Sequence, residues 1–558
     1  MIPTLADSLL PVLYEDEFLL AVAKPAGVDT SVLQRGSPPG VVELIRELRA
    51  SDNTSPLHPV NRLSRYESGI LLLAKEPDVL RSVRAALRTG RVTLDYLAVV
   101  LGSVGKAQII IGGQHGTSRG KTRSPVAKPR TTGSEGRRPG KVVPPTTVRA
   151  LRTGKSHSLV SCRTTLETTH ALRAQLRAAN LRLVGDQLHG GRFKKPDPAS
   201  TCLHLTRIVL VDPRSKRKVT ITLKAPGGFD AALAAKPDVE RPLAAALARR
   251  LPLIARADTD SYRLLTGRYE GVRGLVAERY GDVVILQVLE EYAKLVSSLR
   301  AIAQWYQRML GVQAVYVKRF AKDRDGANES THGRAGLSRL LVGRPAPFEI
   351  TITEHELRYR IRPDDGLAVG LFPDQRENRR RVRDSAKGRE VLNLFAYTCG
   401  FSVAAAAGGA GSTTSVDLSQ KHLDWGQANF TLNDLDPADH EFVRSDAAGY
   451  LKRAQRDGRQ FDLAILDPPS FAHGRKRGQS FSIAKDLPGL VAAVVALLRR
   501  DGVLMVSTNY RRMSLRQFCD LVKAGAGQRR SEVIATPALP PDFAVDPDHA
   551  KSILLQLE

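Results

Sequence analysis

Three aspartates follow predicted strands in the C-terminal third of the chain. Asp417 lies at the end of the predicted strand TTSVDL, Asp446 follows a further strand in VRSDAAGYL, and Asp467 ends LAILD. The carboxyl ends of parallel strands form the ligand crevice of an open α/β sheet, so these carboxylates are suited to hydrogen bonding with a nucleotide. We expect Asp417 to accept hydrogen bonds from a ribose diol and Asp446 to contact an adenine amino group.

A tight turn precedes these aspartates. The strand that contains Asn393 runs directly into Tyr397, Cys399 and Gly400 before a helical pattern begins. A glycine at this point lets the backbone pass close to a ligand. Each feature alone is weak, because a strand-end aspartate is often only a helix cap. In this order and on successive strands they predict a nucleotide-cofactor site that includes Asn393, Tyr397, Gly400, Asp417 and Asp446.

The elements that must position these residues alternate along the chain. From residue 390 onward, strand patterns such as VLNLFAY, TTSVDL, FDLAILD and GVLMVSTN are separated by helical patterns such as HLDWGQANFTLN and LVAAVVALLRR. Strand and helix in alternation predict a parallel, doubly wound, Rossmann-like sheet.

The four loop motifs are NLFAYTCGF, SVDLS, VRSDA and LDPPSF. Together they resemble the class I S-adenosylmethionine-dependent methyltransferases, and the resemblance implies S-adenosyl-L-methionine as the cofactor. With GLFPDQRENRRRV in front of them, residues 255–558 are similar to the large-subunit (23S) ribosomal RNA methyltransferase family, which includes 7-methylguanine and 5-methylcytosine enzymes. By that likeness four residues help to close the cofactor pocket: Phe372, Asp374, Gln375 and Arg376. Taken alone, RENRRRVR is also typical of a solvated basic helix face.

The run after the fourth strand motif is the predicted catalytic loop. It consists of Asp467, Pro468, Pro469 and Phe471, and it resembles the [ND]PP[YF] loop of nitrogen-directed methyltransferases. Asp467 could hold a base edge through its carboxylate or backbone oxygen, while Phe471 stacks on the base. The alternative is a tight turn with a buried phenylalanine.

The choice of methylated atom depends on cysteine. Methylation at carbon-5 of a pyrimidine requires a thiolate that adds to the ring, whereas a purine nitrogen can attack the methyl group directly. Cytosine-methylating relatives carry that cysteine after the strand that follows the DPP loop, where this chain has Ser507, Thr508 and Asn509. We therefore predict a guanine nitrogen, N7 by resemblance of the DPPSF and NYRRM segments, with N2 left open. Five basic residues are expected to contact phosphates: Arg475, Lys476, Arg477, Arg511 and Arg512.

The N-terminal segments, residues 10–225, resemble RNA pseudouridine synthases. The family frame HRLDxxTSG reads NRLSRYESG here, which puts Ser64 where the family has its nucleophilic aspartate. An unactivated hydroxyl cannot replace a carboxylate that is ionised at neutral pH. The later frame GRTHQIR reads ETTHALR, so we predict an inactive RNA-binding domain in which Arg62, Tyr96 and Arg173 contact RNA.

Charge and composition limit the partners. The chain has 84 Lys and Arg against 57 Asp and Glu, a net charge of +27, which favours a polyanionic partner such as ribosomal RNA or the assembling large ribosomal subunit. A small-molecule methyltransferase would not need this charge. No apolar run is long enough to cross a membrane, no secretory signal pattern begins the chain, and the four cysteines lack metal-ligand spacing. We expect a cytoplasmic protein without a metal.

The predicted fold class is multidomain. We expect a pseudouridine-synthase-like α+β domain over residues 1–226, a linker over 227–258, a small α+β middle domain over 259–365, and the α/β methyltransferase domain over 366–558. Three alternatives stay open: a bifunctional pseudouridine synthase and methyltransferase, a cytosine-5 methyltransferase, and a non-catalytic ribosome assembly factor.

Overall fold

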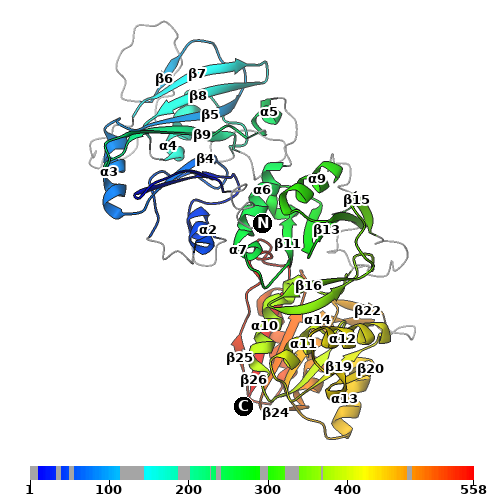
Figure 1. Ribbon diagram of the computed structural model, residues 1–558. Helices are drawn as coiled ribbons and strands as arrows, with labels where there is room; N and C mark the ends of the chain where they lie inside the picture. Colours follow the sequence, from blue (N-terminus) through cyan, green and yellow to red (C-terminus); the bar gives the residue numbers. More distant parts are fainter. Residues whose placement is uncertain are drawn as a thin grey trace, which may run out of the picture. The chain divides into compact units, whose positions relative to one another are not determined.

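The computed structural model describes residues 10–32, 39–49, 56–112, 144–166, 168–186, 201–226, 228–233, 240–289, 299–320, 338–365, 368–473 and 480–558. The chain forms two compact units, which divide between Arg249 and Arg250 (Figure 1). Each unit is described by itself. The second unit contains both the predicted middle domain and the predicted methyltransferase domain.

The first unit is built on a ten-stranded sheet. Its main path is β1-β2-β4-β9-β5-β8-β7-β6, with β10 paired to β9 and β3 paired to β4. The segments RIVLVD and KVTITLKA contribute to the antiparallel pair β9 and β10. The strands are β1 (Val12–Glu15), β2 (Leu19–Lys24), β3 (His58–Pro59), β4 (Ser68–Ala74), β5 (Thr93–Leu101), β6 (Ile109–Ile111), β7 (Thr146–Thr153), β8 (His157–Thr164), β9 (Leu203–Val211) and β10 (Lys218–Thr222).

Helices complete the core of the first unit. The apolar faces of α3 and α4, including Val83 and Leu172, share one buried cluster with the strands. The helices are α2 (Val41–Leu48), α3 (Pro77–Arg88), α4 (Thr169–Ala178), α5 (Gly228–Leu233) and α6 (Glu240–Arg249). The segment predicted as a linker is therefore partly helical, since it contains α5 and α6. It is also packed: α6 lies so close to Gly27 that a Cβ on this glycine would overlap Ala245.

The second unit begins with α7 (Leu251–Ile254) and a five-stranded sheet in the order β11-β12-β13-β14-β15. Only β13 and β14 run parallel, because the helix α9 carries the chain back between them; the other neighbours are antiparallel. Two further strands, β16 and β17, form a hairpin. The elements are β11 (Ser261–Thr266), α8 (Gly267–Glu270), β12 (Leu275–Tyr280), β13 (Val283–Leu289), α9 (Leu299–Leu310), β14 (Ala314–Phe320), β15 (Arg339–Gly343), β16 (Ile350–Glu354) and β17 (Leu357–Ile361).

The C-terminal part is a seven-stranded sheet in the order β20-β19-β18-β21-β24-β26-β25. The strands from β20 to β24 are parallel, as predicted. The last strand, β26, is antiparallel to both neighbours, which the prediction of a parallel sheet missed. Its direction reverses because no helix crosses the sheet between β25 and β26.

Helices cover both faces of this sheet, which makes it doubly wound. Alternate residues of one strand show this: Val391 packs with α10 and α11, whereas Leu392 packs with α13, α14 and α15. The remaining elements are η3 (Pro373–Gln375), α10 (Arg376–Ser385), β18 (Glu390–Leu394), α11 (Gly400–Ala407), β19 (Ser412–Asp417), α12 (Gln420–Leu432), η4 (Pro437–Asp439), β20 (Glu441–Arg444), α13 (Ala447–Arg456), β21 (Phe461–Leu466), β22 (Phe471–His473), β23 (Ser480–Ser482), α14 (Ile483–Val495), β24 (Leu498–Thr508), α15 (Leu515–Ala526), β25 (Ser531–Ala535) and β26 (Lys551–Leu557).

Candidate active site

The turn between β18 and α11 has an unusual backbone. Phe395, Tyr397 and Cys399 all have positive φ, at 58°, 50° and 60°, in a region that favours glycine. Such conformations cost free energy and tend to occur at functional sites. The turn is held by the next strand, because the backbone N–H of Tyr397 donates to Oδ2 of Asp417 over 2.9 Å.

Asp417 ends β19 with its carboxylate fixed in place. Its Oδ1 accepts a hydrogen bond from the Ser419 N–H at 2.9 Å, and its side chain is only 15% exposed. Each carboxylate oxygen has a second lone pair, so the group can still accept hydrogen bonds from a ligand diol.

An aromatic group lies beside this carboxylate. The ring of Tyr397 lies 5.4 Å from Phe372 and 4.7 Å from His422, measured between ring centroids. Phe372 is 45% exposed and Leu418, the residue after Asp417, is 59% exposed. The sequence analysis did not predict a role for Leu418. Its position directly after Asp417 is the feature of the sequence that could have indicated one. These side chains provide apolar surface next to a polar acceptor, as ligand sites do.

The other predicted cofactor residues have different surroundings. Asn393 is buried and donates to Ser402 Oγ over 2.9 Å, so it ties β18 to α11. Gly400 is also buried, and a Cβ there would lie 3.1 Å from Leu371 Cδ1. Asp446 is exposed and caps α13 by accepting the Gly449 N–H at 2.7 Å. Asn393 and Gly400 therefore shape the turn, while Asp446 is at the surface.

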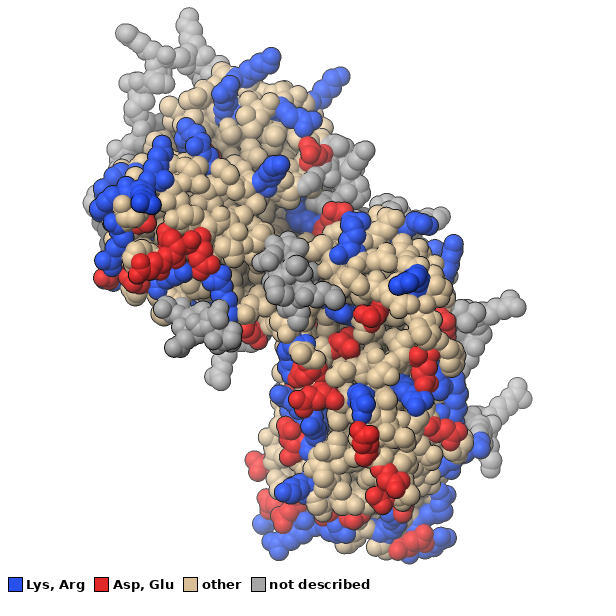
Figure 2. Space-filling view, viewed as in Figure 1, with Lys and Arg blue, Asp and Glu red and all other residues tan. Residues whose placement is uncertain are grey.

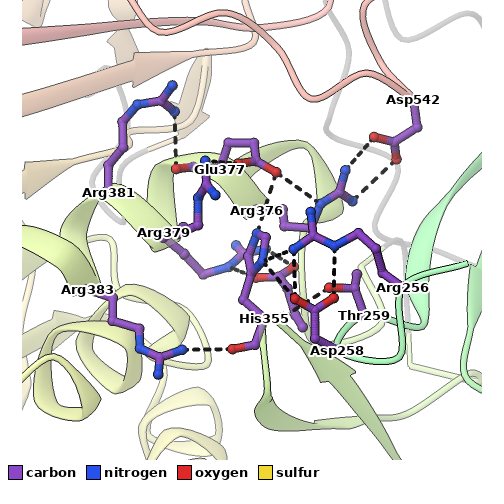
Figure 3. A network of polar contacts seen from close by, with 12 residues as sticks. Arg256, Asp258, Thr259, His355, Arg376, Glu377, Arg379, Arg381, Arg383 and Asp542 are labelled. Carbon is purple, nitrogen blue, oxygen red and sulfur yellow. Dashed lines mark hydrogen bonds and ion pairs between the residues drawn. The ribbon is translucent and has the colours of Figure 1, made fainter. Parts of the chain in front are cut away.

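The segment around η3 belongs to a buried polar network (Figure 3). Arg376 is 0% exposed and points toward Asp542, with Nη2 at 2.6 Å from Oδ1. The solvated-face interpretation of RENRRRVR is therefore wrong for Arg376 and Arg379, both of which are buried. Gln375 is buried as well, and its Oε1 accepts a hydrogen bond from Asn378 at 2.6 Å.

Asp374 makes a charged contact within this segment. Its Oδ2 lies 3.4 Å from Nε2 of His549. Burial opposes ionisation of Asp374, but the hydrogen bond from His549 and the charges of Arg263 and Arg379 outweigh it, so the pKa of Asp374 lies below its ordinary value. Asp374 is thus a negative charge near the catalytic loop.

The predicted catalytic loop follows β21. Burial, reinforced by the Asp374 carboxylate and opposed by the Arg379 guanidinium, raises the pKa of the Asp467 carboxyl to about 7. Pro468 is buried, and Pro469 is half-buried. Phe471 lies edge-to-face with Tyr510, with 5.5 Å between the ring centroids.

The NYRRM segment meets this loop. Ser470 Oγ donates to Asn509 Oδ1 over 2.7 Å, which joins the loops after β21 and β24. Arg511 is engaged in a bidentate ion pair with Asp546, at 3.1 and 2.6 Å, whereas Arg512 is exposed. Arg475, Lys476 and Arg477 lie outside the described residues. On the face shown in Figure 2, Lys and Arg are scattered among Asp and Glu.

The residues predicted to bind RNA in the first unit are placed unequally. Arg62 is exposed, but the Tyr96 ring is 1% exposed and its burial raises the pKa of the phenol. Arg173 is buried between two carboxylates, with Nη2 at 2.5 Å from Asp186 Oδ1 and Nη1 at 3.2 Å from Glu67 Oε1. In this conformation only Arg62 of the three can meet a phosphate.

Comparison with known proteins identifies both units. Residues 337–509 match the model of the S-adenosylmethionine-dependent methyltransferases, and residues 19–178 match that of the RNA pseudouridylate synthases. Ribosomal RNA large subunit methyltransferase K of Neisseria meningitidis serogroup B is 36% identical, over 48% of this chain and 73% of the relative. A ribosomal RNA large subunit methyltransferase of Deinococcus radiodurans is 31% identical, over 57% of this chain and 78% of the relative. The chain belongs to this methyltransferase family.

A solved structure agrees with the family assignment. The methyltransferase SMU.776, complexed with SAH, is 28% identical with a TM-score of 0.51, and the match covers 63% of this chain and 88% of that one. The protein is thus an S-adenosylmethionine-dependent RNA methyltransferase whose N-terminal domain is pseudouridine-synthase-like. Within the described ranges no helix has the length and hydropathy to span a bilayer, and no cluster of metal-ligating residues is found.

The residues of the turn fit S-adenosylmethionine. The fixed Asp417 carboxylate suits a ribose diol, and Leu418 and Phe372 offer apolar surface for a base. The structure also places beside the site residues that the sequence motifs did not predict. Arg379 and Glu354 are buried beside the site and His549 is half-buried there, yet the three come from separate segments that contain no recognisable local motif.

Replacing Asp417 with alanine is expected to weaken the binding of S-adenosylhomocysteine by about 10- to 100-fold, because hydrogen bonds to a charged group are worth about 1.5–3 kcal/mol. Isothermal titration calorimetry measures this. Asp424→Ala, at an exposed position of α12, is the control and should bind normally. An unchanged dissociation constant for Asp417→Ala would contradict the ribose assignment.

Proposed function

We propose that this protein methylates a guanine in large-subunit ribosomal RNA at N7. The observation that carries the proposal is the position of the Asp467 loop. It follows β21, which lies parallel and directly beside β18, the strand that leads into the cofactor turn. A base held by this loop would therefore lie next to the cofactor at the same edge of the sheet.

Cysteine chemistry does not fit the same edge. Cys399 is 0% exposed, and burial raises the pKa of its thiol to about 12, so it is neither accessible nor ionised at neutral pH. Cys519 lies on α15, and burial also raises the pKa of its thiol. This supports attack by a nitrogen rather than by carbon-5 of a pyrimidine.

The chain's residues would act mainly by positioning. When bound, S-adenosylmethionine supplies an electrophilic methyl group. The Asp467 carboxylate would accept hydrogen bonds from the N–H groups on the Watson–Crick edge of guanine, and Phe471 would stack on the base. Both would orient the N7 lone pair toward the methyl group. No proton has to leave N7, so the site needs no strong general base.

The rate should depend on pH through Asp467. Its carboxyl must be ionised to accept two N–H donors, and its pKa is raised to about 7. We expect kcat/KM for RNA to rise about tenfold per pH unit below about pH 7 and to level off above it. Initial rates measured from pH 5.5 to 9 test this. A flat profile would contradict an ionised Asp467 in the rate-determining complex.

Modification mapping tests the substrate directly. We expect mass spectrometry of 23S ribosomal RNA from cells lacking the protein to show one missing methyl group, on a guanine, which returns when the protein is supplied. A missing methyl group on cytosine would contradict the proposal. The names of the relatives support the class of RNA, whereas the methylated atom rests on the site.

We also propose that the first unit binds RNA without isomerising uridine. The observation that supports this is Glu67, which is 0% exposed and whose Oε2 accepts the backbone N–H of Ser64 at 2.7 Å. Its other oxygen pairs with Arg173 at 3.2 Å. Glu67 thus places a buried carboxylate directly beside Ser64, the position at which the family has its aspartate.

Buried charges explain why this exchange is tolerated. Lys24 is 1% exposed and its Nζ donates to the Glu67 carbonyl oxygen at 2.6 Å. Burial lowers the pKa of Lys24 to about 7, while the Glu67 carboxylate opposes that change. Since a buried cation needs an anionic partner, Glu67 and Asp186 keep Arg173 neutralised although the family aspartate is absent. Both Glu67 oxygens are engaged, so this carboxylate is not free to act as a nucleophile.

Restoring the aspartate alone should harm the first unit. Ser64→Asp puts a second carboxylate beside Glu67, and two adjacent buried carboxylates cannot both ionise. We expect hydrogen exchange of β4 in the full-length protein to accelerate by about tenfold or more, and to recover in Ser64→Asp/Glu67→Thr. Ser156→Asp, at an exposed turn, is the control.

The alternative of a bifunctional enzyme is favoured by the match of residues 19–178 to the RNA pseudouridylate synthases. Incubation with RNA carrying tritium at C5 of uridine separates the two proposals. We expect no tritium release from the wild-type protein, with or without cofactor. Release that disappears in Glu67→Gln would establish the bifunctional alternative and reject the inactive domain.

A further inference from the structure

Arg379 joins two elements of the methyltransferase site. It lies on α10 and is 4% exposed. Its Nε and Nη2 donate to the two carboxylate oxygens of Glu354, on β16, at 2.6 and 2.7 Å. Nη2 also donates to the Phe372 carbonyl oxygen at 2.9 Å, and Figure 3 shows Arg379 within the polar network. Because a bidentate pair fixes the plane of the guanidinium, the Phe372 carbonyl has a fixed donor.

The aliphatic part of the same side chain supports the cofactor turn. A Cβ on Gly400 would lie 3.5 Å from Arg379 Cδ, so the stem of Arg379 packs against the first residue of α11. The guanidinium carbon lies 5.9 Å from the ring centroid of Phe401, the next residue. Arg379 therefore contacts both the segment before the site, at Phe372, and the turn that contains Tyr397 and Gly400.

The charge of Arg379 acts on the catalytic loop. Among the described residues, the charged groups that act on Asp467 are Asp374, on η3, and Arg379, on α10, with opposite effects. Asp374 in turn faces His549, Arg263 and Arg379. Glu354 partly neutralises the charge of Arg379. Removing Arg379 would therefore raise the pKa of Asp467, whereas removing the charge of Glu354 would lower it.

We propose that Arg379 is a positioning residue for methyl transfer. It holds the Phe372 carbonyl and the first turn of α11 in the geometry that binds S-adenosylmethionine, and its positive charge keeps Asp467 available as a hydrogen-bond acceptor. The second half of this inference rests on the proposed role of Asp467, and the first half does not.

Conservative and non-conservative variants separate the two roles. Arg379→Lys keeps the positive charge but loses the two-pronged guanidinium contact with Glu354. We therefore expect the dissociation constant of S-adenosylhomocysteine to rise about tenfold, while the acid limb of the pH profile, where kcat/KM falls below about pH 7, stays in place. In Arg379→Met the affinity falls similarly and the acid limb moves up by about one pH unit. Glu354→Gln should move the acid limb the other way. Arg380→Met, on the same helix and 49% exposed, should change both quantities by less than about twofold.

These outcomes also distinguish a merely structural role. Circular dichroism first establishes that each full-length variant is folded, and Arg379→Lys and Glu354→Gln keep the test valid if Arg379→Met does not fold. Unchanged affinity in folded Arg379→Lys would overturn the positioning of the turn. An acid limb in Glu354→Gln that coincides with that of the wild type would overturn the electrostatic half. If Asp467→Asn retained full activity, the proposed role of Asp467 would fail while the affinity result for Arg379 still stood.

Discussion

Asp467→Asn is expected to lower the rate of methyl transfer to ribosomal RNA by about 10²- to 10⁴-fold. Asparagine has the size of aspartate, but it replaces one acceptor oxygen with a donor, so it cannot accept both N–H donors of guanine. The affinity for S-adenosylhomocysteine and for RNA should stay nearly unchanged, because those contacts come from other residues. Transfer of tritiated methyl groups, together with calorimetry and filter binding, measures the three quantities.

The same substitution should stabilise the protein in a pH-dependent way. The pKa of Asp467 is raised in the folded state, to about 7, so the proton bound there favours folding below the ordinary pKa of aspartate, and that contribution is lost as the pH rises through about 7. Asp467→Asn should therefore raise Tm at pH 8 and leave it unchanged at pH 4. Asp457→Asn, at an exposed helix end, is the control. Full methyl transfer by Asp467→Asn would reject the catalytic assignment.

Asp542→Ala is expected to destabilise the second unit by about 3–5 kcal/mol, since it removes the closest ionic partner of the buried Arg376 and leaves only the longer contact with Glu377 at 3.6 Å. The pair is 0% exposed at both side chains, with Nη2 of Arg376 at 2.6 Å from Oδ1 of Asp542. Asp542 Oδ2 also accepts the backbone N–H of Arg263 at 2.8 Å, so β11 loses a contact as well. Urea unfolding followed by the fluorescence of Trp305 and Trp425, both in this unit, measures the change.

An exposed ion pair provides the comparison. Arg358 and Asp434 lie 2.9 Å apart with 46% and 88% exposure, and Asp434→Ala should cost less than about 1 kcal/mol. Equal losses in Asp542→Ala and Asp434→Ala would show that burial does not set the strength of the Arg376 contact. We also expect Asp542→Ala to weaken cofactor binding, because Arg376 begins α10, immediately after η3.

The motifs of the C-terminal domain could be placed from the sequence because they are local. Apolar runs of period two and the residues directly after them indicate where parallel strands end, and the carboxyl ends of parallel strands meet at one edge. The sequence alone therefore predicts that Asp417 and Asp467 share an edge of the sheet. The same reasoning failed for β26, whose antiparallel direction depends on a missing crossover helix rather than on its own residues.

The charged residues illustrate the limit of that reasoning. Arginine is rarely buried unless it has an ionic partner, so the pattern RENRRRVR by itself predicts exposed side chains and not the burial of Arg376 and Arg379. Their partners, Asp542 and Glu354, lie 166 and 25 residues away. In the first unit the loss of the family aspartate could be recognised from one frame of residues. The contact between Glu67 and Arg173, in contrast, depends on where the Arg173 side chain lies, 106 residues later.

The sequence by itself determined the family, the cofactor and the order of strands and helices, because these depend on residues that are neighbours along the chain. The tertiary structure decided which charges are buried and which carboxyl group has its pKa raised to about 7. It also decided which residues predicted to contact RNA, such as Tyr96 and Arg173, lie inside the core instead. The physical reason is that desolvation and ion pairing depend on the distance in space between groups that are far apart in the sequence.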